Sequence, residues 1–288
     1  MYAPFVTECP DGFVMYQEWP EYNLAAEFAS FECAINLPNR SGIRKGPWPL
    51  VVDVFYGDTE PDERLPKDEE APNRAQFWLR TFRQDVPKGW RTSSSRVSKI
   101  EGFADIREGD CTARWSDTAK RHRNKWHREF LNTKYSIEDA EYAIYKQAYL
   151  TSTIGLQIHS FILTTLEKKL ASSQGRHIEL KIMKDLQSGR VVAGMAVMHS
   201  PTYKASYYQS GFYVESVKDE PVMVGLFEDW FVSSKAKGYM YLHLGNFWME
   251  GNPASWKGFS QFKTKFGTQY IAFPPDLSRF KTGKFLWL

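Results

Sequence analysis

The residues best suited to chemistry in this sequence lie near its end, between Gly258 and Gly267. The stretch reads Gly-Phe-Ser-Gln-Phe-Lys-Thr-Lys-Phe-Gly, so Lys263 stands between Phe262 and Phe266. A lysine with aromatic neighbours presents an ammonium group that can meet an anion or stabilise a developing oxyanion. The alternative is that Lys263 and Lys265 form the exposed face of an amphipathic helix whose phenylalanines belong to the core.

A second candidate is the basic stretch from Arg114 to Arg128, which contains Arg121 and Arg123. Its cations could bind phosphate groups, and Trp115 and Trp126 could stack on bases. A helix with a solvated basic face gives the same pattern, so both interpretations stay open.

A third candidate is the polar, aromatic group formed by Tyr203, Lys204, Tyr207 and Tyr208 along a predicted strand. Such side chains could line a pocket for a polar acceptor. Alternation along an exposed strand would produce the same pattern, and the sequence leaves this alternative open.

The composition is that of a globular protein, and its net charge does not by itself indicate binding to nucleic acid. Of the 288 residues, 42% are hydrophobic and 16% are aromatic, which supplies material for a core and for ring-lined pockets. The net charge is only +3, so any anion-binding site must be local.

Cysteines and histidines give no sign of a disulfide framework or a metal site. Cys9, Cys33 and Cys111 are widely spaced and form no CxxC pair, so a reducing, cytoplasmic compartment is expected. His122 and His127 lie five residues apart, which does not place them on one helix face, and no metal site is expected.

The N-terminus lacks a signal-peptide pattern, and no apolar run approaches the roughly 20 residues that span a bilayer. We therefore expect no integral membrane segment.

The first third of the chain has a weak pattern. Hydrophobic spacing predicts helices over residues 18–34 and 76–83 and a strand over 48–56. The acidic, proline-containing residues 57–73 are expected to form an exposed loop, and the serine-rich residues 92–98 a linker or an edge segment.

From about residue 112 the pattern becomes regular. Residues 116–129 are predicted to form a basic helix, and Ser136 is expected to cap a further helix that carries Ile137 and Ala140 on one face. The remaining predicted elements are a helix over 158–172, strands over 178–182, 191–198 and 206–212, a helix from Pro221 to Gly238, a strand over 239–244, a helix over 256–265 and a strand over 268–273.

The element order after residue 137, α-α-β-β-β-α-β-α-β, predicts an α/β protein with a mixed sheet, antiparallel first and parallel later. This order resembles the GNAT acyltransferase fold. In that fold an acyl-CoA places its pyrophosphate on a helix N-terminus, which is reached through a glycine-rich loop. The corresponding residues here, 209–221, contain one glycine, and Asp219 and Glu220 stand at the helix start. Since two carboxylates there would repel a pyrophosphate, the sequence argues against ordinary CoA binding.

Within this fold, residues 258–267 resemble the Gly-Leu-x-x-Phe-Lys-x-x-Phe-Gly pattern of the FemABX-type peptidoglycan-bridge aminoacyltransferases, part of the wider BioF2-like acyltransferase group. The second position holds phenylalanine instead of leucine. The strand around Gly194, the Gly238–Gly245 segment and, imperfectly, residues 120–125 resemble further elements of the family. The resemblance covers residues 110–275.

The resemblance implies an enzyme that moves an aminoacyl group from aminoacyl-tRNA to an amine of a nucleotide-linked or lipid-linked cell-wall precursor, without a separate cofactor. It places Lys263 beside the reacting carbonyl. His243 stands where the family usually has aspartate; it could accept the proton of the acceptor ammonium, or it could be a structural residue. The residues expected to contact substrates are Arg121, Arg123, Lys204, Tyr207, Tyr208, Phe262 and Phe266.

Two alternative functions stay open. One is a CoA-dependent N-acyltransferase, and the other is a catalytically idle module that binds RNA or a nucleotide-linked ligand. We also predict three regions in the chain: residues 1–110 as a reduced GNAT-like or accessory domain, 111–275 as the GNAT-like acyltransferase domain, and 276–288 as a tail that packs back on the N-terminal domain.

Overall fold

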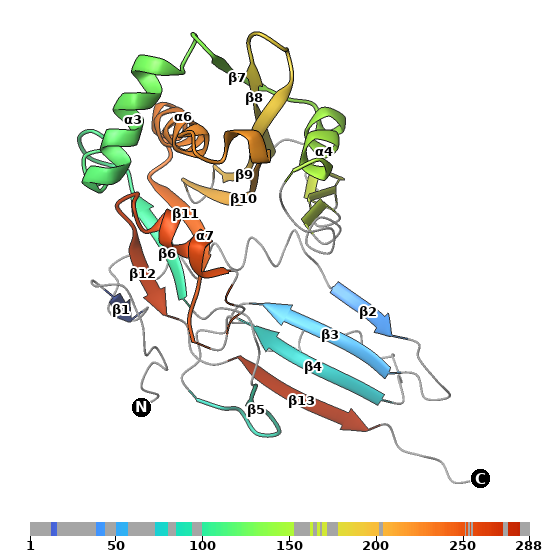
Figure 1. Ribbon diagram of the computed structural model, residues 1–288. Helices are drawn as coiled ribbons and strands as arrows, with labels where there is room; N and C mark the ends of the chain where they lie inside the picture. The colour runs from blue at the N-terminus through green and yellow to red at the C-terminus, as the bar shows by residue number, and fades with distance from the viewer. Residues whose placement is uncertain are drawn as a thin grey trace. The chain divides into compact units, whose positions relative to one another are not determined.

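The fold is described by a computed structural model (Figure 1), which covers residues 13–15, 39–43, 50–56, 73–79, 85–93, 100–152, 162–163, 166–167, 169–171, 178–201, 204–250, 252, 254, 256–272 and 276–282. The helix predicted over 18–34 lies outside these residues. The chain divides into two compact units, one of Met1–Ile100, Phe247–Ala254 and Tyr270–Leu288, the other of Glu101–Asn246 and Ser255–Gln269. Within the described part of the chain, every helix is too short or too polar to cross a membrane.

The first unit contains a five-stranded sheet in the order β2-β3-β4-β13-β5. Its strands are β2 (Asn39–Ile43), β3 (Leu50–Tyr56), β4 (Asn73–Leu79), β5 (Arg91–Thr92) and β13 (Leu277–Thr282). β3 runs parallel to β4, whereas β13 runs antiparallel to it, so residues near the C-terminus complete a sheet begun near the N-terminus. Arg279 Nε donates a hydrogen bond of 2.6 Å to Oε1 of the buried Gln76 and helps to join these two strands. A separate short strand, β1 (Phe13–Met15), pairs in parallel with β12 (Gln269–Ala272).

The helix predicted over residues 76–83 is wrong, because residues 73–79 form strand β4. Its two partners, β3 and β13, lie far away in the sequence, and hydrophobic spacing within a short window does not reveal such pairing. The strand predicted over residues 48–56 is confirmed as β3.

A second, eight-stranded sheet includes six neighbouring strands of the second unit, in the order β6-β11-β10-β9-β8-β7. They are β6 (Ile100–Asp105), β7 (Tyr135–Asp139), β8 (Ile178–Asp185), β9 (Val191–Ser200), β10 (Ala205–Tyr213) and β11 (Tyr241–Phe247). The pairs from β7 to β10 are antiparallel and the pair β10–β11 is parallel. The mixed sheet predicted from the element order is therefore confirmed.

The helix expected to begin at Ser136 starts later than predicted. Residues 135–139 form strand β7 beside β8, and helix α4 spans Tyr142–Leu150. The Ser136 hydroxyl donates to Glu138 at 2.9 Å instead of capping a helix. The pattern around Ile137 fits both structures, because Ile137 alternates with polar neighbours as in a strand and is also three positions from Ala140 as on a helix face.

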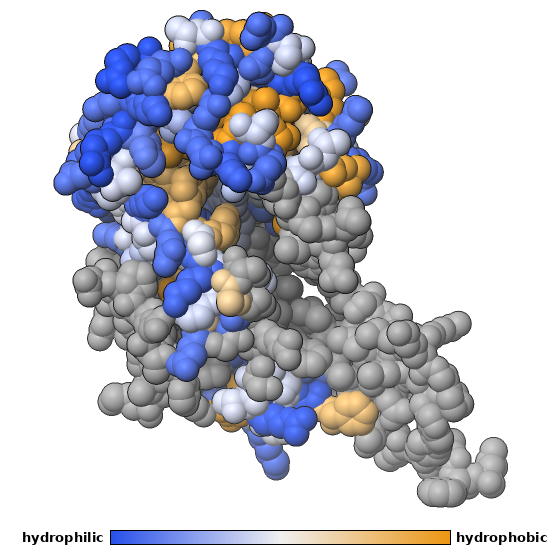
Figure 2. All heavy atoms as spheres, viewed as in Figure 1, coloured by the Kyte–Doolittle hydropathy of each residue, from blue (hydrophilic) through white to orange (hydrophobic). Residues whose placement is uncertain are grey.

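Helices cover both faces of the sheet in the second unit (Figure 1). On one face, α4 contributes Tyr145 and Tyr149 to a core with Leu180 and Phe212. On the other face lies α6 (Val222–Ala236), whose Trp230 donates a hydrogen bond of 2.7 Å to the hydroxyl of Ser206 on β10. The rest of the unit includes α3 (Asp117–Glu129), the 3-10 turn η1 (Glu215–Val217) and α7 (Trp256–Lys263). The face of this unit visible in Figure 2 is mainly hydrophilic.

Helix ends follow the sequence signals closely. Ser116, the first residue of the predicted basic helix, is the N-cap of α3, and its hydroxyl accepts a hydrogen bond of 3.3 Å from the Ala119 amide. Gly238 ends α6 with a φ of 83°, a conformation that favours glycine. Pro221 is the N-cap of α6 and not its first helical residue.

Candidate functional site

The site is built where two parallel strands separate. β10 pairs with β11 at Ala205–Tyr241, Ser206–Leu242 and Tyr207–His243, yet β10 continues to Tyr213 and β11 to Phe247. On its other side β10 stays paired with β9, with a β-bulge between Tyr208 and Ser210. A bulge beside diverging strands redirects side chains locally and is common next to functional sites.

Lys263 lies at the point where the strands diverge. Its side chain is 0% exposed, and its Nζ donates to the carbonyl oxygens of Leu244 at 2.7 Å and of Asn246 at 2.5 Å. The ring of Phe259 lies 4.2 Å from the same nitrogen. Burial lowers the pKa of Lys263 well below its usual value, while the charge of Glu101 opposes this shift. Lys263 therefore binds backbone carbonyls that lie beyond the part of β11 that pairs with β10.

His243 lies in the same buried cluster. Its Nε2 is 2.5 Å from the carboxylate of Glu101 on β6, and the two residues are 1% and 3% exposed. Tyr207 stacks on the imidazole with ring centroids 4.0 Å apart, and Phe103 contacts it edge-on at 4.3 Å. His243 is thus covered by aromatic rings and paired with a carboxylate.

The two predicted catalytic residues meet near Gly245. A Cβ atom added to this glycine would lie 3.9 Å from both the Lys263 Nζ and the Tyr207 hydroxyl. Gly245 has a φ of 76°, so the backbone here turns in a way that side-chain-bearing residues rarely allow. The structure therefore brings Lys263, His243 and Tyr207 together, although none of the three is exposed.

A cavity of about 620 Å³ opens beside this cluster, between α3, β10, the start of α6 and α7. Its cationic and imidazole side chains come from His122 and Lys125 on α3, from Lys218 before α6 and from Lys265 after α7. Of these, Lys218 is paired with Glu215 at 2.6 Å. Its aromatic lining comes from Tyr208, Phe259 and Phe262. The volume lies in the range usual for small-molecule sites.

The charge around the cavity favours an anion. The pKa of His122 is lowered, first by partial burial and then by the positive charges of Lys265, Arg121 and Lys125. Glu220 is also part of the lining, but its carboxylate is engaged by the ammonium of Lys134 at 2.7 Å and by the hydroxyl of Tyr135 at 2.9 Å. The repulsion expected from two carboxylates at the start of α6 is therefore weaker than the sequence indicates, since one of them is already paired.

Tyr208 supplies a polar group at the wall of this cavity. The bulge places Tyr208 and Gly211 both in the lining, and a Cβ at Gly211 would come within 2.5 Å of the Tyr208 hydroxyl. Burial raises the pKa of Tyr208, so the phenol keeps its proton at physiological pH. Among the described residues, no hydrogen bond engages this hydroxyl, which leaves it able to donate one to a ligand.

The other predicted substrate-binding residues have varied surroundings. Arg123 pairs with the buried Glu228 on α6, to which His127 also bonds, so it joins two helices. Arg121 is exposed, with a long contact of 3.4 Å to the Thr118 hydroxyl. Lys204 forms a turn with a φ of 49°, at the opposite end of β10 from the cavity.

The two phenylalanines of the motif differ as well. Phe262 lines the cavity, whereas Phe266 is buried against Trp115 and Phe227.

Sequence reasoning missed His122, Lys125 and Phe259 as residues of this site. His122 and Lys125 are three apart on α3, and Phe259 lies three positions before the predicted Phe262 on α7, a spacing that puts each pair on one helix face. Glu101 had no comparable signal, because β6 was not predicted. Among the described residues, no cluster of histidine, cysteine and acidic side chains could hold a metal ion.

No protein-family model matches this sequence, and no curated protein matches it. Among solved structures, FemX matches with a TM-score of 0.60 and 10% identity, covering 84% of this chain and 83% of FemX. The C-terminal domain of a putative lysylphosphatidylglycerol synthetase from Agrobacterium fabrum matches with a TM-score of 0.50 and 15% identity, covering 80% of this chain and 77% of that domain. L-PGS from Bacillus licheniformis matches with a TM-score of 0.50 and 14% identity, covering 80% of this chain and 77% of that chain.

These similarities establish the fold. The chain has a FemX-like, GNAT-type α/β fold, as the order of its predicted elements and the motif at residues 258–267 led us to expect. At 10–15% identity the similarity does not extend to substrate or donor.

Proposed function

We propose that this protein is an acyltransferase that moves an aminoacyl group from aminoacyl-tRNA to the amine of a cell-wall precursor or a similar acceptor, forming an amide. The observation that supports this proposal is the cavity beside the diverging strands. It combines cations, stacking rings and a protonated phenol within one volume of about 620 Å³. These are the groups that a donor with phosphates, a base and an activated carbonyl requires.

The donor would bind with its terminal phosphates near Lys125 and Lys265, and with its last base against Phe259 or Phe262. Phosphates attract basic side chains, and bases stack on aromatic rings irrespective of sequence. Lys125 is available for this contact because its pairing with Glu129 is long, at 3.9 Å. CoA remains the alternative donor, since the start of α6 faces the same cavity and Glu220 is already paired. The exposed Asp219 still weighs against a pyrophosphate.

The reaction requires no nucleophile from the protein. The neutral amine of the acceptor attacks the ester carbonyl, a carbon–nitrogen bond forms, and the ester carbon–oxygen bond breaks as the ribose hydroxyl leaves with a proton. Tyr208 would donate a hydrogen bond to the oxyanion that develops on the carbonyl, since its phenol is protonated and faces the cavity. Binding both substrates side by side supplies much of the remaining acceleration.

Lys263 and His243 would act indirectly. Both are buried, and their polar atoms contact backbone carbonyls or Glu101. We propose that Lys263 is a positioning residue that fixes the part of β11 beyond its pairing with β10, and that the His243–Glu101 pair holds Tyr207 in place. The carbonyl-polarising role expected of Lys263 would then fall to Tyr208.

The donor can be identified by its effect on the pKa of His122, which lines the cavity. In NMR titrations of the His122 imidazole, adding a tRNA acceptor-stem minihelix should raise the pKa of His122, because an anion near Lys125 and Lys265 offsets their charge. Lys125→Gln and Lys265→Gln should each weaken minihelix binding several-fold. Lys120→Gln, on the same helix but outside the cavity lining, is the matched control.

Transfer itself is assayed with labelled aminoacyl-tRNA or acyl-CoA and an amine-bearing muropeptide, with the amide product recognised by its resistance to mild alkali. A rise in the pKa of His122 with CoA but not with the minihelix, together with transfer from acyl-CoA, would establish the alternative donor. Binding of a minihelix without transfer to any amine would favour the idle binding module.

A further inference from the structure

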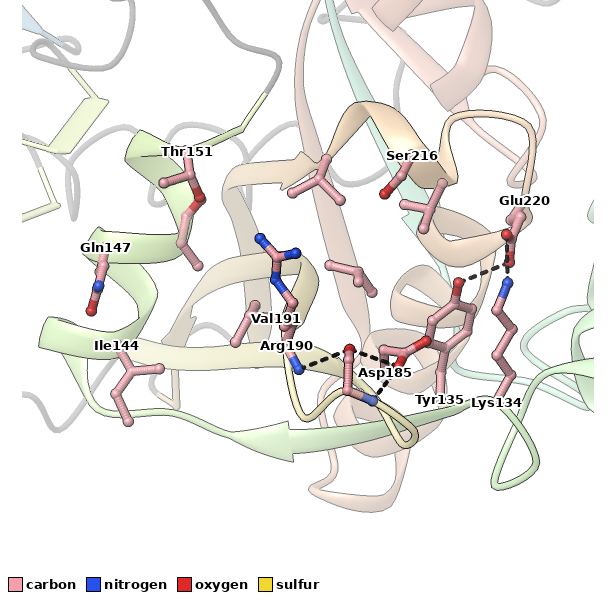
Figure 3. A pocket seen from close by; sticks show the side chains of 15 residues that line it. Lys134, Tyr135, Ile144, Gln147, Thr151, Asp185, Arg190, Val191, Ser216 and Glu220 are labelled. Atoms are coloured by element: carbon pink, nitrogen blue, oxygen red, sulfur yellow. Dashed lines mark hydrogen bonds and ion pairs between the residues drawn. The ribbon is translucent and has the colours of Figure 1, made fainter.

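A second cavity lies in the same unit, bordered by α4, the β8–β9 hairpin and η1 (Figure 3). Its volume is about 660 Å³, comparable to that of the first cavity. The proposed acyl transfer makes no use of it. Its lining combines two cationic side chains, Lys134 and Arg190, with an aliphatic floor.

Arg190 lies at the end of the hairpin turn between β8 and β9. Figure 3 shows its side chain extending among the lining residues, with no hydrogen bond or ion pair drawn to its guanidinium. The backbone of Arg190 is fixed, because its carbonyl accepts from the Asp185 amide at 2.9 Å and its amide donates to the Ser188 hydroxyl at 3.3 Å. The guanidinium is thus presented from a well-defined turn.

Both carboxylates that line this cavity bond to other lining residues, and no ion pair joins either of them to Arg190. Asp185 accepts from the amide and the hydroxyl of Ser188, at 2.7 and 2.8 Å. Glu220 accepts from Lys134 and from Tyr135, at 2.7 and 2.9 Å. Among the described lining residues, Arg190 is therefore the one cation with no ion pair to a carboxylate of the cavity. Asp185 keeps its negative charge, since the Ser188 groups that bond to it are neutral.

The remaining lining is largely aliphatic. Ile144 on α4 is 45% exposed, and Val191 and Val214 of the same lining are half-buried. Behind them, Val192 and Val217 are buried and close the floor. An exposed isoleucine beside valines gains free energy when an aliphatic group covers it.

We propose that this second cavity binds a small aliphatic monocarboxylate. The carboxylate would accept two parallel hydrogen bonds from the Arg190 guanidinium, a geometry that the planar fork of arginine favours. The branched aliphatic body would lie over Ile144, Val191 and Val214. A monoanion fits better than a phosphate dianion, because the second cation of the lining, Lys134, is already paired with Glu220.

The proposal is tested by methyl NMR titration of the full chain with 4-methylpentanoate as the probe. Saturable shifts are expected at the Ile144 and Val191 methyl groups, while 4-methylpentanamide, which has the same body and no charge, should bind at least about tenfold more weakly. Arg190→Gln should weaken the acid by a similar factor, and Arg190→Lys by less. Arg128→Gln, an exposed change on α3 outside this cavity, should leave binding unchanged.

Four results would overturn this assignment. They are equal binding of acid and amide, unchanged binding in a folded Arg190→Gln variant, tighter binding of methyl phosphate than of the carboxylate, and shifts confined to residues of the first cavity. The melting temperature of each variant establishes that it is folded. The outcome does not depend on the acyl-transfer proposal, since no step of that reaction uses Arg190 or Ile144.

Discussion

Replacement of Lys263 by methionine should change how the stability of the protein depends on pH. Methionine nearly conserves the volume, so the substitution mainly removes a buried amine and the hydrogen bonds that it donates to the carbonyls of Leu244 and Asn246. The two hydrogen bonds are worth about 1 kcal/mol each, so the variant should be less stable than the wild type by about 2 kcal/mol at high pH.

The difference should shrink as the pH falls. The folded pKa of Lys263 lies well below 10.5, so between the two values the unfolded chain binds a proton that the folded chain does not. Stability of the wild type therefore rises with pH in this window, by up to about 1.4 kcal/mol per pH unit, and the methionine variant lacks this contribution. Near neutral pH the variant should match or exceed the wild type in stability.

Urea unfolding of both proteins between pH 6 and pH 10 measures this effect directly. The matched control is Lys265→Met, two residues further along, where the side chain is only half-buried and the wild-type slope should persist. If the stability curves of wild type and Lys263→Met run parallel across this range, Lys263 is not held as a buried, readily deprotonated amine, and the structural role assigned to it is wrong.

Three further predictions concern separate parts of the second unit. Tyr208→Phe should leave the melting temperature within a few degrees and lower kcat for acyl transfer by about 100-fold, because one oxyanion donor is lost; an unchanged kcat would remove Tyr208 from the reaction. Gly194→Ala should destabilise the fold by about 1–3 kcal/mol in urea unfolding, since its Cβ would lie 2.5 Å from the ring of Phe212. Glu179→Gln should flatten the acid limb of the stability curve. The hydrogen bond with His199 is the main cause that lowers the pKa of the Glu179 carboxyl, so the stabilisation by this carboxylate is present above pH 4.5 and is lost as the pH falls toward the folded pKa. An acid limb identical to that of the wild type would contradict this last assignment.

Local sequence signals were sufficient for most of the second unit. Its regular hydrophobic spacing and its end signals, Ser116 and Gly238, are properties of neighbouring residues, and the helices and hairpin follow from them. The element order then gave the fold. The predicted domain boundaries, in contrast, stay a prediction.

The parts that local reasoning missed depend on contacts between distant residues. Strand β4 exists because β3 and β13 flank it, and β7 because β8 lies beside it. Glu101 became recognisable only when β6 placed it 2.5 Å from His243, which is 142 positions away. Neither spacing nor composition encodes such a pair.

The stretch from Gly258 to Gly267, which contains most of α7 and the turn after it, serves two purposes. Phe259, Phe262 and Lys265 follow each other at intervals of three and line the cavity. Lys263, one position after Phe262, is directed to the carbonyls of β11. The spacing separates ligand contact from support, so changes on the two faces should have different kinetic effects. Lys265→Gln should raise KM for the donor with little change in kcat, whereas Lys263→Met, which loosens the end of β11, should lower kcat. A fall in kcat alone for both variants would show that ligand contact and support are not separate in this stretch.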